Sequence, residues 1–353
     1  MSNAILKFAG VSSIAAVLQA AAPALAAGTV YVTNQGGSVT LLDAATLAPE
    51  DTIELKDNDP RGVAVTPDGK YLLTANQKTG DVAVIDTATR KVVRRVPIGK
   101  NPEFLRVLPD GGKAFVTFEP SSEGGPPKSK SGKDDQDVAE IPAQVAVIDL
   151  KSWRTVASIV GAPETEGIEF SKDGKRIAIS NEGNDTVTVY DIATGKLQKT
   201  VDLHAQGSRP RGIKLAPDGS YYVVTMENSN GMVILDPDFN VVKSVPTGKG
   251  PYGVAFDRMG KHILVAAARD SLLQVFDGTS YAKLAEIPIG KRCWHFTYTP
   301  DESRLLVACG RSNEVQVIDA TTWKPVKSIP GFDLPWGIVT FPKANGSLDA
   351  PTR

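Results

Sequence analysis

The stretch from Pro60 to Gly99 decides the fold, and it reads PRGVAVTPDGKYLLTANQKTGDVAVIDTATRKVVRRVPIG. It contains four short runs in which apolar and other residues alternate, the pattern of β-strands with two different faces. Between the first two runs, Pro67-Asp68-Gly69 suits a tight turn, because proline presets one backbone angle and glycine accepts a positive φ. The stretch therefore predicts one four-stranded sheet.

The same unit returns along the whole chain at a period typical of propeller blades. An aspartate ends the third run of each copy and should cap the turn that follows through side-chain to backbone hydrogen bonds, in company with the threonine after it, as in Asp86-Thr87. These aspartates recur about every 40 residues, with one longer interval of about 60, and they are Asp43, Asp86, Asp149, Asp191, Asp236, Asp277 and Asp319. Seven copies predict an all-β, seven-bladed β-propeller.

The two ends of the chain predict how the ring closes. The repeat enters at Tyr31-Val32-Thr33-Asn34, which corresponds to a second strand, so the first blade lacks its first strand. The run from Pro335 to Phe341 matches that missing strand, and we expect Ile338 to lie beside Val32. Such a closure removes open sheet edges and fastens both termini. The propeller is thus expected over residues 28–343, with a C-terminal tail over 344–353.

Two segments fall outside the repeat. Residues 1–27 contain Lys7, a short apolar run and Ala24-Leu25-Ala26, a pattern typical of a cleaved export signal, so we expect a periplasmic or secreted protein. Residues 120–142 are dominated by Ser, Gly, Pro, Lys and Asp, which predicts a flexible inserted loop in blade three. This loop is either a lid or docking arm or, in the reading we favour, a tolerated surface insertion.

Charge excludes one class of function. The formal net charge is -1 with 22% charged residues, so no overall basic field is available to grip nucleic acid or anionic lipid. Outside the export signal, no run of residues is apolar for long enough to span a membrane. The composition is that of an ordinary soluble globular protein, for which we expect a monomer.

The candidate site lies where the blades begin, because the first strand of a blade is the innermost one. The positions after each opening proline should surround the central opening, and they hold Arg61, Glu103, Glu166, Arg211, Tyr252, Trp294, His295 and Trp336. Guanidinium groups, carboxylates and aromatic rings together could hold a planar or anionic organic ligand by paired hydrogen bonds and stacking. The alternative is that the arginines and glutamates pair across the opening while the aromatic rings plug it.

Catalytic and metal-binding patterns are weak. The loops of a propeller lie on two opposite faces of the disc, and we expect His262 on the other face from His204 and His295, so a three-histidine metal site is not expected. We also expect no bound cofactor. Glu103 and Glu166 could act as an acid and base pair, but no serine occupies a recognisable nucleophile elbow. We therefore favour a protein without catalytic residues over an enzyme.

The two cysteines bracket one predicted hairpin. Cys293 begins the first strand of blade seven and Cys309 ends the second, so the hairpin brings them opposite or nearly so. A disulfide is one outcome in an oxidising compartment, and two buried thiols are the other.

The repeat resembles a known family. The motifs Tyr31-Val32-Thr33-Asn34, Val82 to Thr87 and Val96-Pro97-Ile98-Gly99 resemble YVTN propeller repeats, a family that includes surface-layer and YncE-like periplasmic proteins. A narrower resemblance, over Gly290 to Trp294, Phe296 to Glu302 and Pro335-Trp336-Gly337, is to the propeller protein associated with pyrroloquinoline quinone (PQQ)-dependent alcohol catabolism.

These resemblances imply a function for the face of the disc on which the innermost strands begin. They imply an exported binding or scaffold propeller that meets a small organic ligand or a periplasmic partner, a dehydrogenase or cytochrome, on the face bearing Trp294 and Trp336. The alternatives are an oxidoreductase subunit or a lactonase-type hydrolase with its site at the central opening, and a cell-surface adhesion protein.

Overall fold

The structure, a computed structural model, describes residues 28–344 apart from 57 and 121–141, together with Met1 and Asp349. Nearly all of the predicted export signal, the interior of the predicted insertion and most of the C-terminal tail lie outside the described residues. In the part of the chain that is described, no helix is long and apolar enough to cross a membrane.

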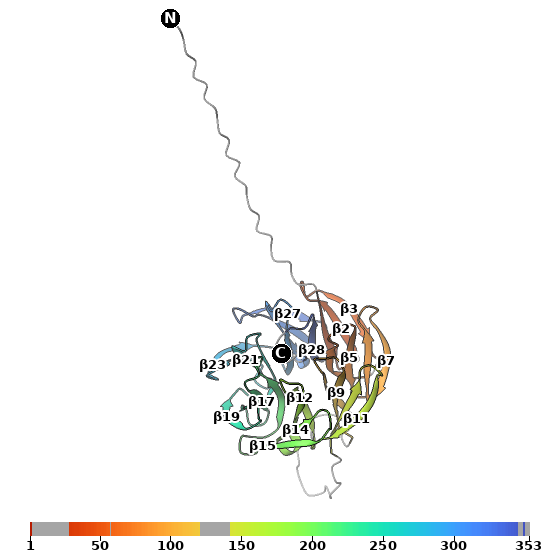
Figure 1. Cartoon of the computed structure of the whole chain (residues 1–353). Coiled ribbons are helices and arrows are strands. Elements are labelled where there is room, and N and C mark those ends of the chain that lie inside the picture. The colour runs from red at the N-terminus through yellow and green to blue at the C-terminus, as the bar shows by residue number, and fades with distance from the viewer. Residues whose placement is uncertain (2–27, 57, 121–141, 345–348, 350–353) are drawn as a thin grey trace.

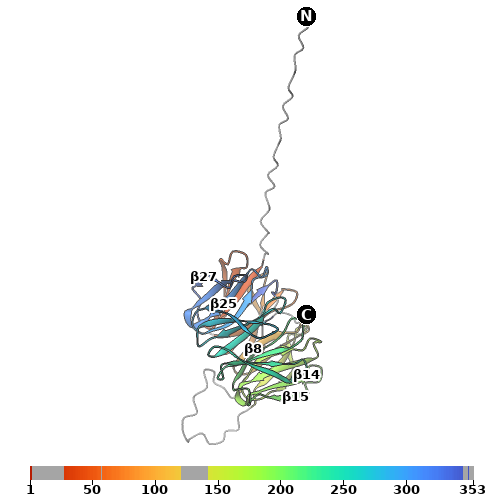
Figure 2. The same ribbon diagram turned by 90° about the vertical axis from the view of Figure 1, so that its left-hand side faces the viewer.

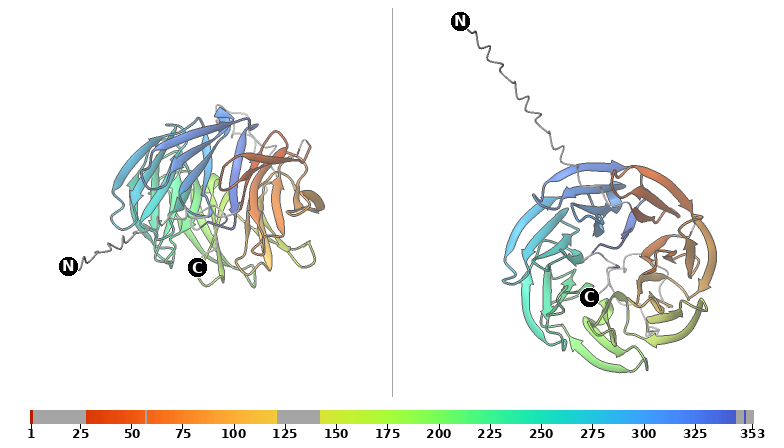
Figure 3. Two further views of the ribbon diagram at one scale, coloured as in Figure 1. Left: turned by 90° about the horizontal axis from the view of Figure 1, so that it is seen from above. Right: turned by 45° about the horizontal axis from the view of Figure 1, so that its top comes forward.

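The described residues form seven four-stranded antiparallel sheets arranged in a ring, which confirms the predicted seven-bladed β-propeller (Figures 1 and 3). A view turned by 90° shows the ring edge-on (Figure 2). The ring closes as predicted: β28 pairs with β1, and Ile338 lies opposite Val32. The first blade therefore takes its innermost strand from the C-terminal end of the chain and its other three from the N-terminal end.

Each blade runs from the innermost strand to the outermost. Blade one consists of β28 (Pro335–Phe341), β1 (Thr29–Asn34), β2 (Ser38–Asp43) and β3 (Pro49–Glu54); blade two of β4 (Pro60–Val65), β5 (Tyr71–Asn76), β6 (Asp81–Asp86) and β7 (Lys91–Pro97). Blade three consists of β8 (Pro102–Val107), β9 (Lys113–Phe118), β10 (Gln144–Asp149) and β11 (Arg154–Val160); blade four of β12 (Thr165–Phe170), β13 (Arg176–Asn181), β14 (Thr186–Asp191) and β15 (Leu197–Asp202). Blade five consists of β16 (Pro210–Leu215), β17 (Tyr222–Met226), β18 (Gly231–Leu235) and β19 (Val241–Pro246); blade six of β20 (Pro251–Phe256), β21 (His262–Ala267), β22 (Leu272–Asp277) and β23 (Lys283–Pro288). Blade seven consists of β24 (Cys293–Tyr298), β25 (Arg304–Cys309), β26 (Glu314–Asp319) and β27 (Pro325–Pro330), and two short 3-10 helices follow second strands, η1 (Glu182–Asn184) and η2 (Gly310–Ser312).

The core lies between adjacent blades. One apolar cluster joins blades two and three through Leu73, Val84 and Val116, and another joins blades six and seven through Leu264 and Leu305. The inner three strands of a blade are buried along nearly their whole length, whereas the fourth strands expose most of their residues. Burial is continuous because successive side chains of an inner strand point to opposite faces of the sheet, and each face packs against a neighbouring blade.

The aspartates at the ends of the third strands cap the next turn through side-chain to backbone hydrogen bonds, as predicted, although at Asp86 the threonine that donates is Thr89 and not Thr87. Asp86 Oδ1 accepts hydrogen bonds from the backbone N (2.7 Å) and Oγ1 (2.9 Å) of Thr89, three residues on. Thr87 instead donates its hydroxyl proton to the carbonyl of Gly69, at 2.6 Å. A side chain three residues later reaches the aspartate because the turn folds back over it.

Hydroxyl groups on second strands join one blade to the next beside the central opening. Thr225 Oγ1 accepts a hydrogen bond from Gly212 N of its own blade (2.9 Å) and donates one to the carbonyl of Tyr252 in the next blade (2.6 Å). Thr33 does the same between Gly337 N (2.9 Å) and the carbonyl of Arg61 (2.7 Å). These bridges fix the backbone of the residues that line the opening.

Candidate functional site

A β-bulge near the start of every innermost strand positions the candidate residues. In blade two, Pro60 pairs with Asn76 and Val63 with Thr74, so Arg61 and Gly62 together oppose Ala75. The same shift occurs in the other six blades. A bulge turns a side chain out of the strand's regular alternation, and here the turned residues of neighbouring blades come into contact.

The predicted residues do meet at the opening, as ion pairs on one side of the ring. Arg61 forms a salt bridge with Glu103 of the next blade, and Arg211 forms one with Glu166 of the preceding blade. The guanidinium of Arg211 also lies over the Tyr252 ring, 4.6 Å from its centroid, and donates a hydrogen bond to the hydroxyl at 3.1 Å.

Charged residues that were not among the predicted candidates extend these pairs into an arginine–glutamate cluster. The cluster comprises Arg61, Arg209, Arg211, Arg269 and Arg292 with Glu103, Glu166, Glu182 and Glu227. Glu182 and Glu227 follow second strands, and Arg209 and Arg292 precede innermost strands. Glu182, Glu227 and Arg269 all follow second strands, and no periodic pattern in the sequence says which of these residues point toward the opening.

Glu227 is the centre of the cluster. It lies 2.7 Å from Arg211 Nε, 3.0 Å from Arg269 Nη2 and 3.1 Å from Arg209 Nε, while Arg292 Nη1 is 3.8 Å away. Its side chain is only 3% exposed. Burial opposes ionisation, but the surrounding guanidinium groups outweigh it and lower the pKa of Glu227 to about 2.

The remaining carboxyl groups differ in the direction of their pKa shifts because burial and the surrounding charges act on each of them differently. Burial, followed by the charges of Glu103 and Glu182, raises the pKa of Glu166 well above its usual value despite Arg211. Burial also raises the pKa of Glu182 to about 8, although Arg209 and Arg211 lie beside it. Burial acts in the same direction on Glu103, but Arg61 and a hydrogen bond from Glu166 lower its pKa overall. Burial and the neighbouring carboxyl groups thus disfavour ionisation of Glu166 and Glu182, whereas the guanidinium groups favour ionisation of Glu103 and Glu227.

Two donors of the cluster lack an acceptor. Arg61 Nε and Arg292 Nε are buried and have no hydrogen-bond partner among the described residues. Arg269 and Arg292 also reach the surface, with 45% and 26% of their side chains exposed. A buried N–H group without an acceptor is costly, so an incoming oxygen atom would find donors already in place.

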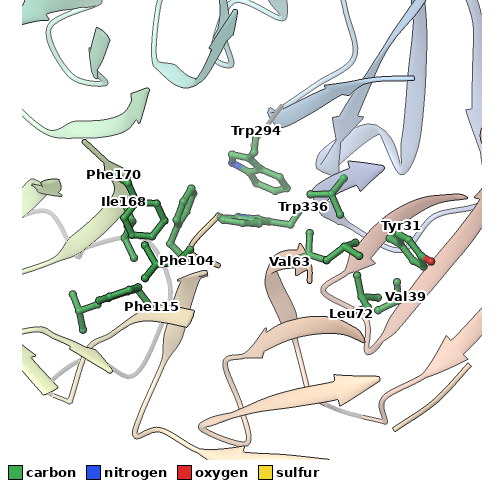
Figure 4. Close-up of a cluster of buried hydrophobic side chains, with 14 of the residues drawn as sticks. Tyr31, Val39, Val63, Leu72, Phe104, Phe115, Ile168, Phe170, Trp294 and Trp336 are labelled. Atoms are coloured by element: carbon green, nitrogen blue, oxygen red, sulfur yellow. The ribbon is translucent and has the colours of Figure 1, made fainter. Parts of the chain in front are cut away.

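An aromatic plug fills the other side of the opening. The rings of Phe104, His295 and Trp336 contact one another edge to face, with centroids 4.3 Å apart for His295 and Trp336 and 5.8 Å for Phe104 and His295. Figure 4 shows Trp294, Trp336 and Phe104 converging from three different strands. Gly310 lies against Trp294 so closely that a Cβ there would be 1.8 Å from the indole. Arginines and glutamates are therefore paired at the opening, and aromatic rings pack together beside them.

The plug depends on two departures from the repeat. Five blades place glycine second in the bulge, where a Cβ would clash with the next blade's backbone, and these are Gly62, Gly167, Gly212, Gly253 and Gly337. The other two blades have Phe104 and His295 there, and these two rings meet across the opening. Phe104 was missed by sequence reasoning, although its replacement of a repeated glycine was a signal.

His295 is buried in a neutral state. It is 3% exposed, and its Nε2 has no hydrogen-bond partner among the described residues. Burial, followed by the positive charge of Arg211, lowers its pKa to about 3. The other histidines lie elsewhere: His204 contacts Asp202 and His262 contacts Asp257.

The two cysteines lie directly opposite each other in β24 and β25 and are joined by a disulfide. The bond lies next to Trp294 and ties the beginning of the innermost strand to the second strand of blade seven.

Comparisons with known proteins support the class that this fold and site define, a seven-bladed β-propeller. The family model "Lactonase, 7-bladed beta-propeller" matches residues 137–240. The chain is 24% identical to "Uncharacterized protein YncE" of Salmonella typhimurium over 58% of this chain and 53% of that protein. It is 23% identical to "Protein NirF" of Stutzerimonas stutzeri over 73% of this chain and 66% of that protein. The chain thus spans between about half and two thirds of the length of these two curated relatives.

A solved structure agrees on the fold. "Kuenenia stuttgartiensis Hydrazine Synthase" superposes with a TM-score of 0.70 at 23% identity, covering 83% of this chain and 92% of that chain. At such identity the likeness concerns the propeller fold alone.

Proposed function

We propose that this chain is a non-catalytic binding propeller that holds an anionic, planar organic ligand at the arginine–glutamate cluster. The observation that carries this proposal is the pair of buried guanidinium N–H groups without acceptors among the described residues, on Arg61 and Arg292, beside Arg269, whose side chain is 45% exposed. Carboxylates and phosphates are the groups that arginine recognises best, through paired, charge-assisted hydrogen bonds. Flat rings on the ligand would then meet Trp294 at the border of the cluster.

The buried state of the carboxyl groups favours binding over catalysis. Glu103 and Glu166 are each held by an arginine and by each other, so neither is presented to a reacting molecule as an available base. His295 faces rings of Phe104, Tyr252 and Trp336 rather than a nucleophile. A general base must reach the proton that it takes.

A lactonase is the second candidate, and one observation favours it. Glu103 and Glu166 share a hydrogen bond and have pKa values shifted in opposite directions, the pattern of an acid and base pair. The partial match to the lactonase family model points the same way.

Ligand titration tests the binding proposal. PQQ is a suitable probe because it is planar and carries several carboxylates, and calorimetry can follow its binding to the purified chain. We expect the double substitution Arg269→Gln and Arg292→Gln to weaken binding by about tenfold or more, since each charge-assisted hydrogen bond contributes about 1.5–3 kcal/mol. The matched control is Arg94→Gln with Arg154→Gln, two exposed arginines on the outermost strands β7 and β11.

The outcome separates the two candidates. Equal affinity of the cluster variant and the control would refute an anion site at this cluster. Ring opening of gluconolactone that is lost in Glu166→Gln would establish the lactonase instead.

The cellular setting is part of the same proposal. We infer an exported protein that serves a PQQ-dependent dehydrogenase system, on the strength of the residue 1–27 pattern and of the motif around Cys293 and Trp294. Purification of the tagged full chain from the periplasm of its own cells tests this. A dehydrogenase or cytochrome that co-purifies would support the inference, and recovery of the chain from the cytoplasm with its first residues intact would overturn it.

A further inference from the structure

A hollow lies at the junction of blades six and seven, away from the residues of the arginine–glutamate cluster. It has a volume of about 410 Å³, and its lining includes Asp257, Arg258, Lys261, His262, Tyr298 and Trp323. Tyr298 ends β24, whereas Trp294 stands near the beginning of the same strand. The hollow therefore opens at the opposite end of the innermost strands from the proposed anion site, and we call it the six–seven pocket.

A buried hydroxyl lines this pocket without a partner. Tyr298 is 3% exposed, and its Oη has no hydrogen-bond partner among the described residues. Buried tyrosine hydroxyls normally have one. In blade six the equivalent residue is Phe256, which closes β20 in the same register. A phenylalanine without a hydroxyl therefore packs at this position in blade six, so packing alone does not require the Tyr298 hydroxyl in blade seven.

Two aromatic side chains form the pocket's outer wall. The rings of His262 and Trp323 contact each other edge to face at 5.4 Å. Asp257 Oδ2 lies 2.5 Å from His262 Nδ1 and fixes the ring, so the Nε2 edge is the one left for a ligand. Trp323 is only partly buried, which leaves part of the indole for contact.

Comparison with the preceding junction explains why a hollow exists here. Between blades five and six the same two positions hold Tyr221 and Tyr281, whose rings are 5.6 Å apart. The Tyr221 hydroxyl donates a hydrogen bond to the carbonyl of Gly278 at 2.7 Å and so fills the space between the blades. His262 replaces Tyr221 at the next junction, and its shorter side chain leaves that space open.

The charges around the six–seven pocket balance. Asp257 and Glu302 contribute two carboxylates, and Arg258 and Lys261 contribute two cations. A balanced rim gives no net attraction to an anion or a cation. With aromatic walls and one unused donor, such a pocket is complementary to a neutral ring that carries a hydrogen-bond acceptor.

We propose that the six–seven pocket binds a small uncharged aromatic compound with a carbonyl or other acceptor atom. Tyr298 donates its hydroxyl proton to the acceptor, and the rings of Trp323 and His262 pack against the ligand. This site is separate from the arginine–glutamate cluster and does not depend on the function proposed for it.

Benzamide is the probe, because it is planar, neutral and carries a carbonyl acceptor. Ligand-observed NMR titration of the full chain should detect its binding, and benzoate, its charged analogue, should bind more weakly. We expect Tyr298→Phe to weaken benzamide binding about three- to tenfold, the effect of one hydrogen bond. This variant reproduces the phenylalanine of blade six, so the blade has a packing precedent within the same chain.

A second variant removes the aromatic wall. Trp323 occupies a turn position with a φ of 56°, which asparagine tolerates, so Trp323→Asn should fold and bind benzamide still more weakly. Trp153 has the same place in blade three, with a φ of 57° and its own ring contact to Tyr71. Trp153→Asn is therefore the matched control and should bind benzamide as the unchanged protein does.

The result that overturns the proposal is plain. Equal benzamide affinity in the unchanged protein, Tyr298→Phe and Trp323→Asn would show that the pocket does not hold the ring. A preference for benzoate that disappears in Arg269→Gln with Arg292→Gln would place the binding at the arginine–glutamate cluster instead.

Discussion

Replacing His295 with phenylalanine should make the folded protein less sensitive to mild acid. His295 is fully enclosed by the rings of Phe104, Tyr252 and Trp336, and its folded-state pKa is about 3. An unfolded histidine has a pKa of about 6.5. Because the folded pKa is depressed, the unfolded chain binds more protons between these values, and the free energy of unfolding falls as the pH falls below about 6.5.

The size of the effect follows from the proton that must be lost on folding. At pH 5 the histidine of the unfolded chain is mostly charged, and returning it to the neutral state costs about 1.4 kcal/mol for each pH unit below 6.5, or about 2 kcal/mol in all. Phenylalanine carries no such proton. Any change in packing caused by the larger phenylalanine ring would alter the free energy of unfolding by the same amount at every pH.

Urea unfolding at pH 7.5, 6 and 5 measures the effect. We expect the stability of His295→Phe relative to the unchanged protein to rise by about 2 kcal/mol between pH 7.5 and pH 5. Glu166 and Glu182 titrate in both proteins, so their contributions largely cancel in the difference.

An exposed histidine provides the control with the opposite sign. A hydrogen bond to Asp202 raises the pKa of His204, so its contribution is present at acid pH and is lost as the pH rises. His204→Gln should therefore lose stability relative to the unchanged protein at pH 5, by a small amount. If the difference between His295→Phe and the unchanged protein stays constant from pH 7.5 to 5, the neutral burial of His295 is refuted.

Three further perturbations test other parts of the structure. Glu182 has a pKa raised to about 8, so the free energy of unfolding should fall as the pH rises from about 4.5 to 8, and Glu182→Gln should flatten this decline in urea titrations; an unchanged slope would contradict the assignment. Reduction of the Cys293–Cys309 disulfide, which spans a sequence separation of 16, should cost about 3 kcal/mol and lower the melting temperature, whereas Cys293→Ser with Cys309→Ser should show no further change on adding reductant. Ile338→Ala should cost about 2–5 kcal/mol in denaturant unfolding, because Ile338 is fully buried in the strand that closes the ring, and a loss below 1 kcal/mol would argue against that closure.

The sequence by itself determined the blades and their closure. Strand alternation and turn formation depend on residues that are close together in the sequence. Each copy of the pattern therefore specifies one four-stranded sheet, whatever the rest of the chain contains. The missing first strand before Tyr31 and the surplus strand from Pro335 then leave a single pairing, which β1 and β28 adopt. Because all innermost strands begin alike, the same reasoning also brought Arg61, Glu103, Glu166, Arg211 and the aromatic residues to one opening.

The tertiary structure decided what those side chains do there. Only the assembled ring shows that Glu227 forms ion pairs with Arg209, Arg269 and Arg292. The same is true of the contact between the rings of Phe104 and His295. The reason is physical: ion pairing, burial and the choice between a plug and an open channel depend on distances across the opening. These distances join residues from different blades, and a pattern that repeats along the chain contains no information about them.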